Sequence, residues 1–203
     1  MRARDMFLKN DKCLFYFFVI IIILLSNTGR SNTDNKNKIL NYLSNLKYFS
    51  ASFLQNDGED LSEGKVYIGE KRVRAEYISP TKILIILDED KAMYYNYELE
   101  EDEFFNPKNT NAWFFYDIFR NPIFFEDSKI KIKNNEVVLE KNGVNFEDKE
   151  FIIKAYFENN PLVLRGIEVI IDKDVIKLSI YNHAYNQEFD KSFFKLINPS
   201  FLN

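Results

Sequence analysis

Residues 151–181 read FIIKAYFENNPLVLRGIEVIIDKDVIKLSIY, and in this stretch apolar side chains alternate with polar ones over three runs. Such alternation is typical of β-strands that bury one face. The runs are separated by Asn159-Asn160-Pro161 and by Asp172-Lys173-Asp174, residue types that favour tight reversals of the chain. The stretch therefore predicts consecutive strands joined as antiparallel hairpins.

The same period of two continues on the N-terminal side of this stretch. It recurs in shorter segments, which are Ser50–Gln55, Gly64–Ile68, Arg72–Ile78, Lys82–Leu87, Lys91–Leu99, Lys129–Lys133 and Glu136–Glu140. We expect turns at Asp88-Glu89-Asp90 and at Asn142-Gly143. Together these segments predict one antiparallel sheet of roughly ten strands, and strand twist makes a sheet of that size curl. One face of the sheet is therefore expected to be concave.

Two segments, residues 33–45 and 109–120, interrupt the alternation and show helical spacing. Their apolar positions lie three or four residues apart: Ile39, Leu40, Leu43 and Leu46 in or just after the first, and Trp113, Phe114, Ile118 and Phe119 in the second. Thr33 or Asp34 can cap the first helix, and Pro122 ends the second. Because a concave apolar face must be covered, we expect these two amphipathic helices to cover it.

The N-terminal segment has the features of an export signal. Basic residues between Arg2 and Lys12 precede the apolar run Cys13–Leu25, which at 13 residues is short for a membrane span. We expect residues 1–29 to be a signal peptide and residues 30–203 to form a single domain, with an uncleaved anchor as the alternative. Cys13 is the only cysteine. The exported chain would therefore have neither a disulfide nor a lipidated cysteine.

Composition and motifs argue against catalysis and against nucleic-acid binding. The chain has 31 acidic and 27 basic residues, and no long basic stretch that would bind a phosphate backbone. His183 is the only histidine, there is no G-x-S-x-G motif, and we interpret His183 as a surface or hydrogen-bonded histidine. The acidic run from Glu98 to Glu103 is interpreted as a solvated turn rather than a cation site. We therefore expect no enzyme activity, no metal and no cofactor.

Several short motifs, in their order along the chain, resemble the LolA family of outer-membrane lipoprotein carrier proteins. They span roughly residues 33–200. They are the helix-to-strand junction Leu46–Gln55, the strand Gly64–Ile68, the segment Arg74–Pro80, the hairpin Ile85–Tyr97, the turn Asn160–Gly166 and the closing segment Phe193–Pro199.

This resemblance implies an incomplete β-barrel closed by a helical lid. It also implies a periplasmic chaperone that shields the acyl chains of lipoproteins in a hydrophobic cavity. The partners would be acylated lipoproteins, an inner-membrane lipoprotein-releasing ABC transporter and an outer-membrane acceptor, and we expect the carrier itself to be a monomer. Two alternatives remain: a periplasmic domain that senses lipoproteins or lipids without transporting them, and an envelope hydrolase with scattered catalytic residues.

Strand parity and helical spacing select candidate acyl-chain ligands. They are Phe53, Val66, Ile68, Ile85, Leu87 and Tyr95 on the concave face, and Trp113, Phe114 and Ile118 on the aromatic helix.

The sequence departs from the family at one position that concerns the lid. The family commonly carries an Arg-Pro pair after the second strand, and its arginine helps to hold the lid. Gly69 and Glu70 stand in the corresponding positions here. Arg72 or Arg74 could substitute for that arginine, but a strand arginine that faces solvent is the simpler interpretation. The sequence thus leaves open what holds the lid.

Overall fold

The computed structural model describes residues 33–202. The predicted signal peptide and its cleavage site therefore lie outside the described residues. The chain divides into a unit of residues 1–38 and a unit of residues 39–203, and the second unit is described below. Among the described residues, no helix is long and apolar enough to cross a membrane.

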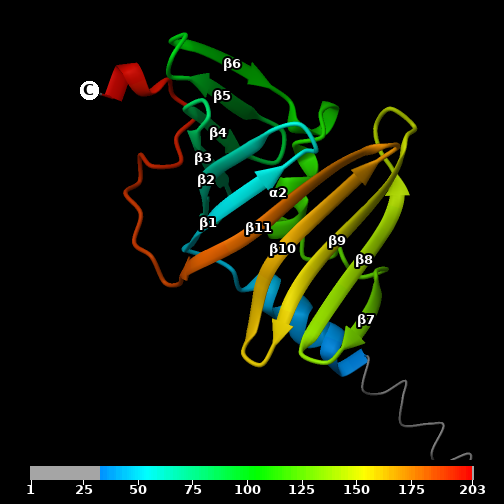
Figure 1. The fold of residues 1–203 in the computed structure, drawn as a ribbon. Coiled ribbons are helices and arrows are strands. Elements are labelled where there is room, and N and C mark those ends of the chain that lie inside the picture. Colours follow the sequence, from blue (N-terminus) through cyan, green and yellow to red (C-terminus); the bar gives the residue numbers. More distant parts are fainter. Residues whose placement is uncertain (1–32, 203) are drawn as a thin grey trace, which may run out of the picture. The chain divides into compact units, whose positions relative to one another are not determined.

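The second unit is built on one antiparallel sheet of 11 strands in the order β6-β5-β4-β3-β2-β1-β11-β10-β9-β8-β7 (Figure 1). The strands are β1 (Phe49–Asn56), β2 (Leu61–Ile68), β3 (Val73–Ser79), β4 (Ile83–Leu87), β5 (Ala92–Asn96), β6 (Glu101–Phe105), β7 (Lys129–Lys133), β8 (Glu136–Val144), β9 (Glu150–Asn159), β10 (Leu162–Ile171) and β11 (Asp174–Ala184). Because β6 and β7 each have one neighbour, the sheet curls without closing into a barrel. The predicted fold class, a mainly β protein with one incompletely closed sheet and two helices, is confirmed.

Two predicted turns are strands in the structure. Residues 101–103 of the acidic run pair with residues 94–96 of β5, so the predicted solvated turn is wrong for these three residues. The turn lies at residues 97–100, where Asn96 Oδ1 accepts hydrogen bonds from the backbone N–H groups of Glu98 and Leu99. Carboxylates on the edge strand β6 discourage pairing with another chain.

The second correction concerns Asn142-Gly143, which lies inside β8 instead of in a turn. Gly143 pairs with Phe151, and a Cβ on Gly143 would lie 2.6 Å from the Phe151 ring. The glycine therefore makes room for an aromatic ring. The reversal follows at Asn145, whose Oδ1 accepts hydrogen bonds from Glu147 N and Lys149 N.

Two helices contribute side chains to the core on the inner face of the sheet. One spans residues 33–44, and from it Ile39 and Leu43 are buried. The other is α2 (Trp113–Arg120), which follows the 3-10 turn η1 (Pro107–Asn109) and buries Phe114, Ile118 and Phe119. The predicted second helix thus begins later than residue 109. All of these buried side chains belong to one hydrophobic cluster with strands from both halves of the sheet.

The C-terminal segment, residues 185–202, lies against the outward face of β2 and β3. Phe193 packs edge-on against Tyr67 of β2 with ring centroids 4.9 Å apart, and the Phe194 ring lies directly over Gly69. Figure 1 shows this segment, in orange to red, passing beside β2 to β4 before the 3-10 turn η2 (Pro199–Leu202). The sheet is therefore covered on its outward side as well, along one half.

Arg72 and Arg74 hold this C-terminal segment, and the interpretation of both as solvent-facing strand residues is wrong. Arg72 Nη1 donates to Phe194 O at 2.9 Å, and its Nε donates to Asp88 Oδ2 at 2.6 Å. The Arg74 guanidinium lies 4.2 Å from the centre of the Phe193 ring. Neither arginine hydrogen-bonds to α2 in the described structure, so neither replaces the missing lid arginine.

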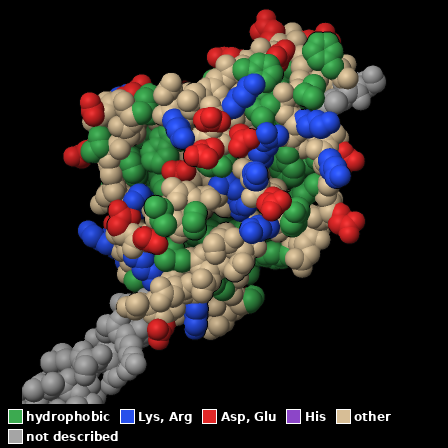
Figure 2. Space-filling model, turned by 180° about the vertical axis from the view of Figure 1, so that it is seen from behind, with side chains coloured by type: hydrophobic (Ala, Val, Ile, Leu, Met, Phe, Trp, Pro, Cys, Tyr) green, Lys and Arg blue, Asp and Glu red, His purple; other side chains and the backbone are tan. Residues whose placement is uncertain are grey.

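The other half of the outward face carries charge pairs across its strands. Lys131 of β7 pairs with Glu140 of β8, and Lys154 of β9 pairs with Glu168 of β10. Figure 2, which shows the molecule from the side opposite to the view of Figure 1, also shows acidic and basic side chains interspersed. A surface of mixed sign gives no extended basic field for a phosphate backbone.

His183 is partly buried and hydrogen-bonded, which agrees with its interpretation from the sequence. Its Nε2 lies 2.7 Å from Leu164 O, and its ring packs against Phe49 and Tyr185. Burial lowers the pKa of His183, and the bond to the Leu164 carbonyl opposes that shift only in part. The neutral imidazole is therefore favoured in the folded state.

The stability of the protein should consequently fall as the pH drops below about 6.5, the ordinary pKa of histidine. In that range His183 is protonated in the unfolded chain but still largely neutral in the folded chain, so protonation favours unfolding. The loss of stability is complete only below the lowered pKa of His183 in the folded state. Urea unfolding of the wild type and of His183→Gln between about pH 7.5 and pH 5 measures the difference. The variant should lose less stability than the wild type across this range. Equal losses in the two proteins would contradict a lowered pKa of His183 in the folded state.

Candidate functional site

The inner face of the sheet lines a partly open cavity of about 260 Å³ whose surface is mostly apolar. Strands from both halves of the sheet line it, together with α2 and the residues just before this helix. The apolar lining consists of Phe53, Val66, Val73, Ala75, Ile85, Leu87, Ala112, Phe115, Phe119, Ile167, Val169, Ile176, Leu178 and Ile180. Such a surface binds ligands through the burial of apolar area, with little demand for specific hydrogen bonds.

The cavity has a polar end and an apolar end, and β3 shows this gradient most clearly. Its inward-facing residues are Val73, Ala75 and Tyr77, in that order along the strand. Val73 is almost fully buried, while Tyr77 is partly exposed and stands beside Gln55 of β1. Asn111, which is exposed, is the third polar lining residue. A ligand with one apolar and one polar end therefore has a defined direction in this cavity.

Gln55 and Tyr77 form a hydrogen-bonded pair at the polar end. The Tyr77 hydroxyl donates to Gln55 Oε1 at 2.9 Å. Burial raises the pKa of Tyr77 to about 12, so the phenol stays protonated at neutral pH and keeps its donor role. The Gln55 amide nitrogen forms no hydrogen bond with the described residues, which leaves two N–H donors at the polar end of the cavity.

Helix α2 presents one face to the cavity and the opposite face to the core. Phe115 and Phe119, with Ala112 just before the helix, line the cavity. Phe114 instead packs edge-on against Phe151 of β9, with ring centroids 4.8 Å apart. Its ring also lies against that of Trp113, tilted by 36° at a centroid distance of 4.0 Å. Trp113, Phe114 and Ile118 therefore hold the helix to the sheet, and the positions that face the cavity are others.

Arg120, at the end of α2, anchors the helix to the end of the β2–β3 hairpin. Its Nη1 donates to Gly69 O at 2.8 Å and to Glu70 O at 3.1 Å, and its Nη2 donates to Leu46 O. Burial lowers the pKa of Arg120, although a guanidinium remains charged at neutral pH in any case. Arg120 is not distinctive in the sequence, because a basic residue in the last turn of a helix is common.

The predicted ligands fall into three groups in the structure. Phe53, Val66, Ile85 and Leu87 line the cavity. Ile68, Trp113, Phe114 and Ile118 belong to the hydrophobic core around it, where Ile68 and Phe114 are fully buried. Tyr95 lies in a separate small cluster with Leu84, Ile86 and Met93, on the outward face of the sheet. Whether any of them binds an acyl chain stays a prediction.

Tyr95 faces outward because the turn before β5 is one residue longer than predicted. Four residues, Asp88–Lys91, separate β4 from β5, and Leu87 pairs with Ala92. Within this turn Asp88 N donates to Lys91 O. A loop of three residues would have paired Leu87 with Lys91 instead. Successive side chains of a strand alternate between the two faces of the sheet. The extra residue therefore places every side chain of β5 on the face opposite to the predicted one.

Residues of β10 and β11 also line the cavity, although none of them was predicted as a ligand. Ile167 and Val169 of β10, with Ile176, Leu178 and Ile180 of β11, all line it. Their alternation was visible in the sequence, but nothing local showed that β11 pairs with β1 and so brings these strands beside Phe53. Among the described residues, no group of three or more His, Cys, Asp or Glu side chains is placed to hold a metal ion.

Comparisons with known proteins agree with this architecture. The sequence model of one family, described as outer membrane lipoprotein carrier protein LolA, matches residues 44–197. An uncharacterized conserved protein from Thermus thermophilus superposes with a TM-score of 0.51 at 10% identity, over 83% of this chain and 94% of that chain. At this identity the likeness concerns the fold alone.

Two further structures superpose less well. A chain of the Pseudomonas aeruginosa MucA/MucB complex gives a TM-score of 0.48 at 6% identity, over 81% of this chain and 60% of that chain. A DUF1329 family protein from Desulfovibrio piger ATCC 29098 gives 0.44 at 9% identity, over 82% of this chain and 96% of that chain. No curated protein matches the chain.

Proposed function

The chain belongs to the LolA family of outer membrane lipoprotein carrier proteins, and from this premise we propose that it carries acylated lipoproteins through the periplasm. In this proposal an inner-membrane lipoprotein-releasing ABC transporter supplies the lipoprotein, and an acceptor in the outer membrane receives it. Family membership by itself supports a periplasmic domain that binds lipids or lipoproteins, and the carrier role is the further step.

The observation that carries the proposal is the apolar cavity beneath α2. Its lining is apolar except for Gln55, Tyr77 and Asn111, and acyl chains need only such a surface. The cavity lies under a short helix that two different sets of contacts hold in place: the buried Phe114 and the anchor Arg120. A ligand can therefore be shielded from water when the helix is in place, and can leave when it is displaced.

The test is a release assay with the purified protein and spheroplasts that export lipoproteins. The wild type should release acylated lipoprotein into the medium as a complex of about one to one, visible by native mass spectrometry. Ala75→Phe, which places a ring in the middle of the cavity, should abolish the complex. Ser179→Phe is the matched control, because residue 179 follows a cavity residue on β11 but is exposed.

Release by the wild type and by Ser179→Phe, but not by Ala75→Phe, supports a carrier. Failure of the wild type to release any lipoprotein would overturn the proposal. If the wild type binds lipoprotein but its depletion mislocalises none, the carrier role fails and the alternative, a sensor that recognises lipoproteins without transporting them, gains support.

A further inference from the structure

The dimensions of the cavity suggest which ligand the protein accepts without a rearrangement, an inference that rests on the proposed function. An apolar cavity of about 150 Å³ holds benzene, which corresponds to roughly 25 Å³ for each carbon atom. By that measure the cavity of about 260 Å³ accommodates about ten carbons. This is far less than several long acyl chains need.

The extent of the cavity along β3 gives a second figure. Val73 and Tyr77 are the first and last lining residues on this strand, four residues apart. At about 3.3 Å for each residue of a strand, the lining of β3 extends over about 13 Å. An extended hydrocarbon chain advances by about 1.25 Å for each carbon, given bonds near 1.5 Å and tetrahedral angles. The length therefore also corresponds to about ten carbons.

The two ends of the cavity fix how such a chain would lie. Val73, Leu87 and Phe119 close one end, and all three are at most 5% exposed. At the other end, the Gln55 amide and the Tyr77 hydroxyl offer the polar groups, held together by their own hydrogen bond of 2.9 Å. A methyl terminus suits the first end and a polar headgroup suits the second, because an unpaired polar group is costly to bury.

We propose that, with α2 in place, the cavity binds one acyl chain of about ten carbons, with its polar end at Gln55 and Tyr77. The ligand class is a single-chain amphiphile. Longer chains leave their remaining carbons outside the cavity and gain nothing from them.

Isothermal titration with single-chain phosphocholines of increasing acyl length, kept below their micelle-forming concentrations, tests the proposal. Each added methylene is worth about 0.8 kcal/mol, so the dissociation constant should fall about fourfold for each carbon up to about ten carbons. Beyond that length it should stop falling. A dissociation constant that keeps falling through about fourteen carbons, or no binding at any length, would overturn the proposal.

Single substitutions test where the acyl chain lies. The measured quantity is the acyl length at which the dissociation constant stops falling, which we call the break. Ala75→Leu adds three carbons in the middle of the cavity and should move the break to about seven carbons, whereas the exposed Ser179→Leu should leave it at about ten. Gln55→Leu should weaken binding about fivefold at every length without moving the break, because it removes the amide donor for the headgroup and the acceptor of the Tyr77 hydroxyl while it changes the side-chain volume little. A break that stays at the wild-type length in Ala75→Leu would show that the chain lies elsewhere.

The chain-length titration and the lipoprotein release assay can fail independently of one another. A clear break without any lipoprotein complex would leave the single-chain site standing and remove the carrier role. A lipoprotein complex without a break would show that the cavity enlarges on loading, which overturns the length limit alone.

Discussion

Replacing Phe114 by alanine should lower the free energy of unfolding by about 3–5 kcal/mol, the cost of emptying a buried aromatic site. Phe114 is fully buried, with Trp113 and Phe151 packed against its ring. The neighbouring Phe115 is only partly buried and faces the cavity, so Phe115→Ala should cost no more than about 1.5 kcal/mol. Urea unfolding of both variants measures the difference.

The same two variants separate the core face of α2 from its cavity face. Phe115→Ala enlarges the cavity and should move the break in the chain-length series to longer acyl chains. Phe114→Ala, studied below its unfolding transition, should leave the break where it is. The reverse pattern would mean that Phe114 contacts the ligand, as the sequence alone suggested.

Replacing Arg120 by methionine should lower the free energy of unfolding by about 2–4 kcal/mol. The substitution removes charge-assisted hydrogen bonds to three backbone carbonyls, those of Leu46, Gly69 and Glu70. It leaves those oxygens without their partner, and that loss is why the effect exceeds the value of an ordinary surface charge. Arg120→Lys keeps a charge but not the planar fork, and its effect should be intermediate.

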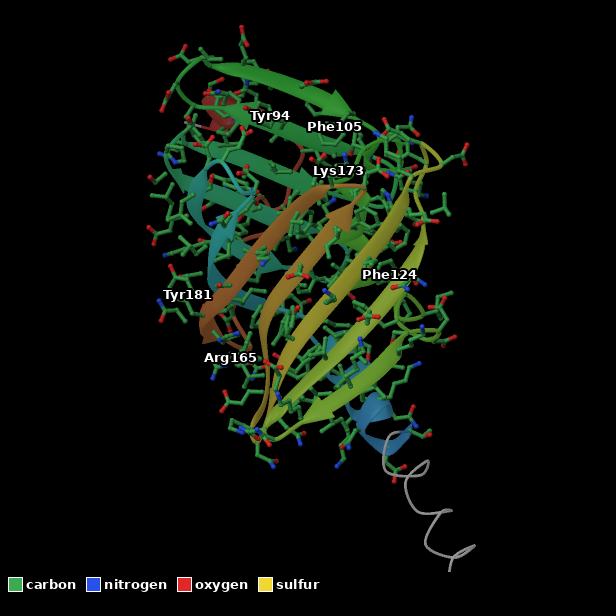
Figure 3. The ribbon with its side chains drawn as sticks, turned by 45° about the vertical axis from the view of Figure 1, so that its right-hand side comes forward. Tyr94, Phe105, Phe124, Arg165, Lys173 and Tyr181 are labelled. Atoms are coloured by element: carbon green, nitrogen blue, oxygen red, sulfur yellow. The ribbon has the colours of Figure 1, made fainter. Side chains whose placement is uncertain are left out.

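The control for Arg120 is Arg165→Met on β10, a position labelled in Figure 3. Arg165 also binds a partner, the carboxylate of Glu158, but its side chain is 49% exposed. An exposed ion pair contributes at most about 1 kcal/mol. Hydrogen exchange of the α2 amides should accelerate in Arg120→Met and not in Arg165→Met, and equal stability losses in the two variants would contradict an anchoring role for Arg120.

Arg120 links α2 to the end of the β2–β3 hairpin, a contact for which the sequence alone offered no residue. The resemblance to the family pointed to an arginine after the second strand, where this chain has Gly69 and Glu70. In the structure the guanidinium comes from the helix, and the backbone carbonyls of Gly69 and Glu70 receive it. A contact between α2 and the end of β2 is therefore present, but its arginine lies on the helix instead of after the strand.

Much of the fold could be predicted because strand periodicity is a local property. The run from Phe151 to Tyr181 became β9, β10 and β11, each paired with its neighbour in sequence. The predicted helix over residues 109–120 survives as α2, since its aromatic residues recur at helical spacing. Errors arose where one residue changes the outcome, as in the loop of Asp88–Lys91 and at Gly143.

The sequence by itself determined that this chain forms a large curled antiparallel sheet, with apolar helices to cover it, and that it resembles a family of lipoprotein carriers. Alternation and helical spacing are written into short stretches, so they need no knowledge of distant contacts. Only the tertiary structure decided which side chains face the cavity. That outcome depends on the pairing of β1 with β11 and on the rotation of α2, which are set by packing between residues far apart in the chain. It also depends on the length of one local turn, where a single residue reverses the side-chain parity of β5.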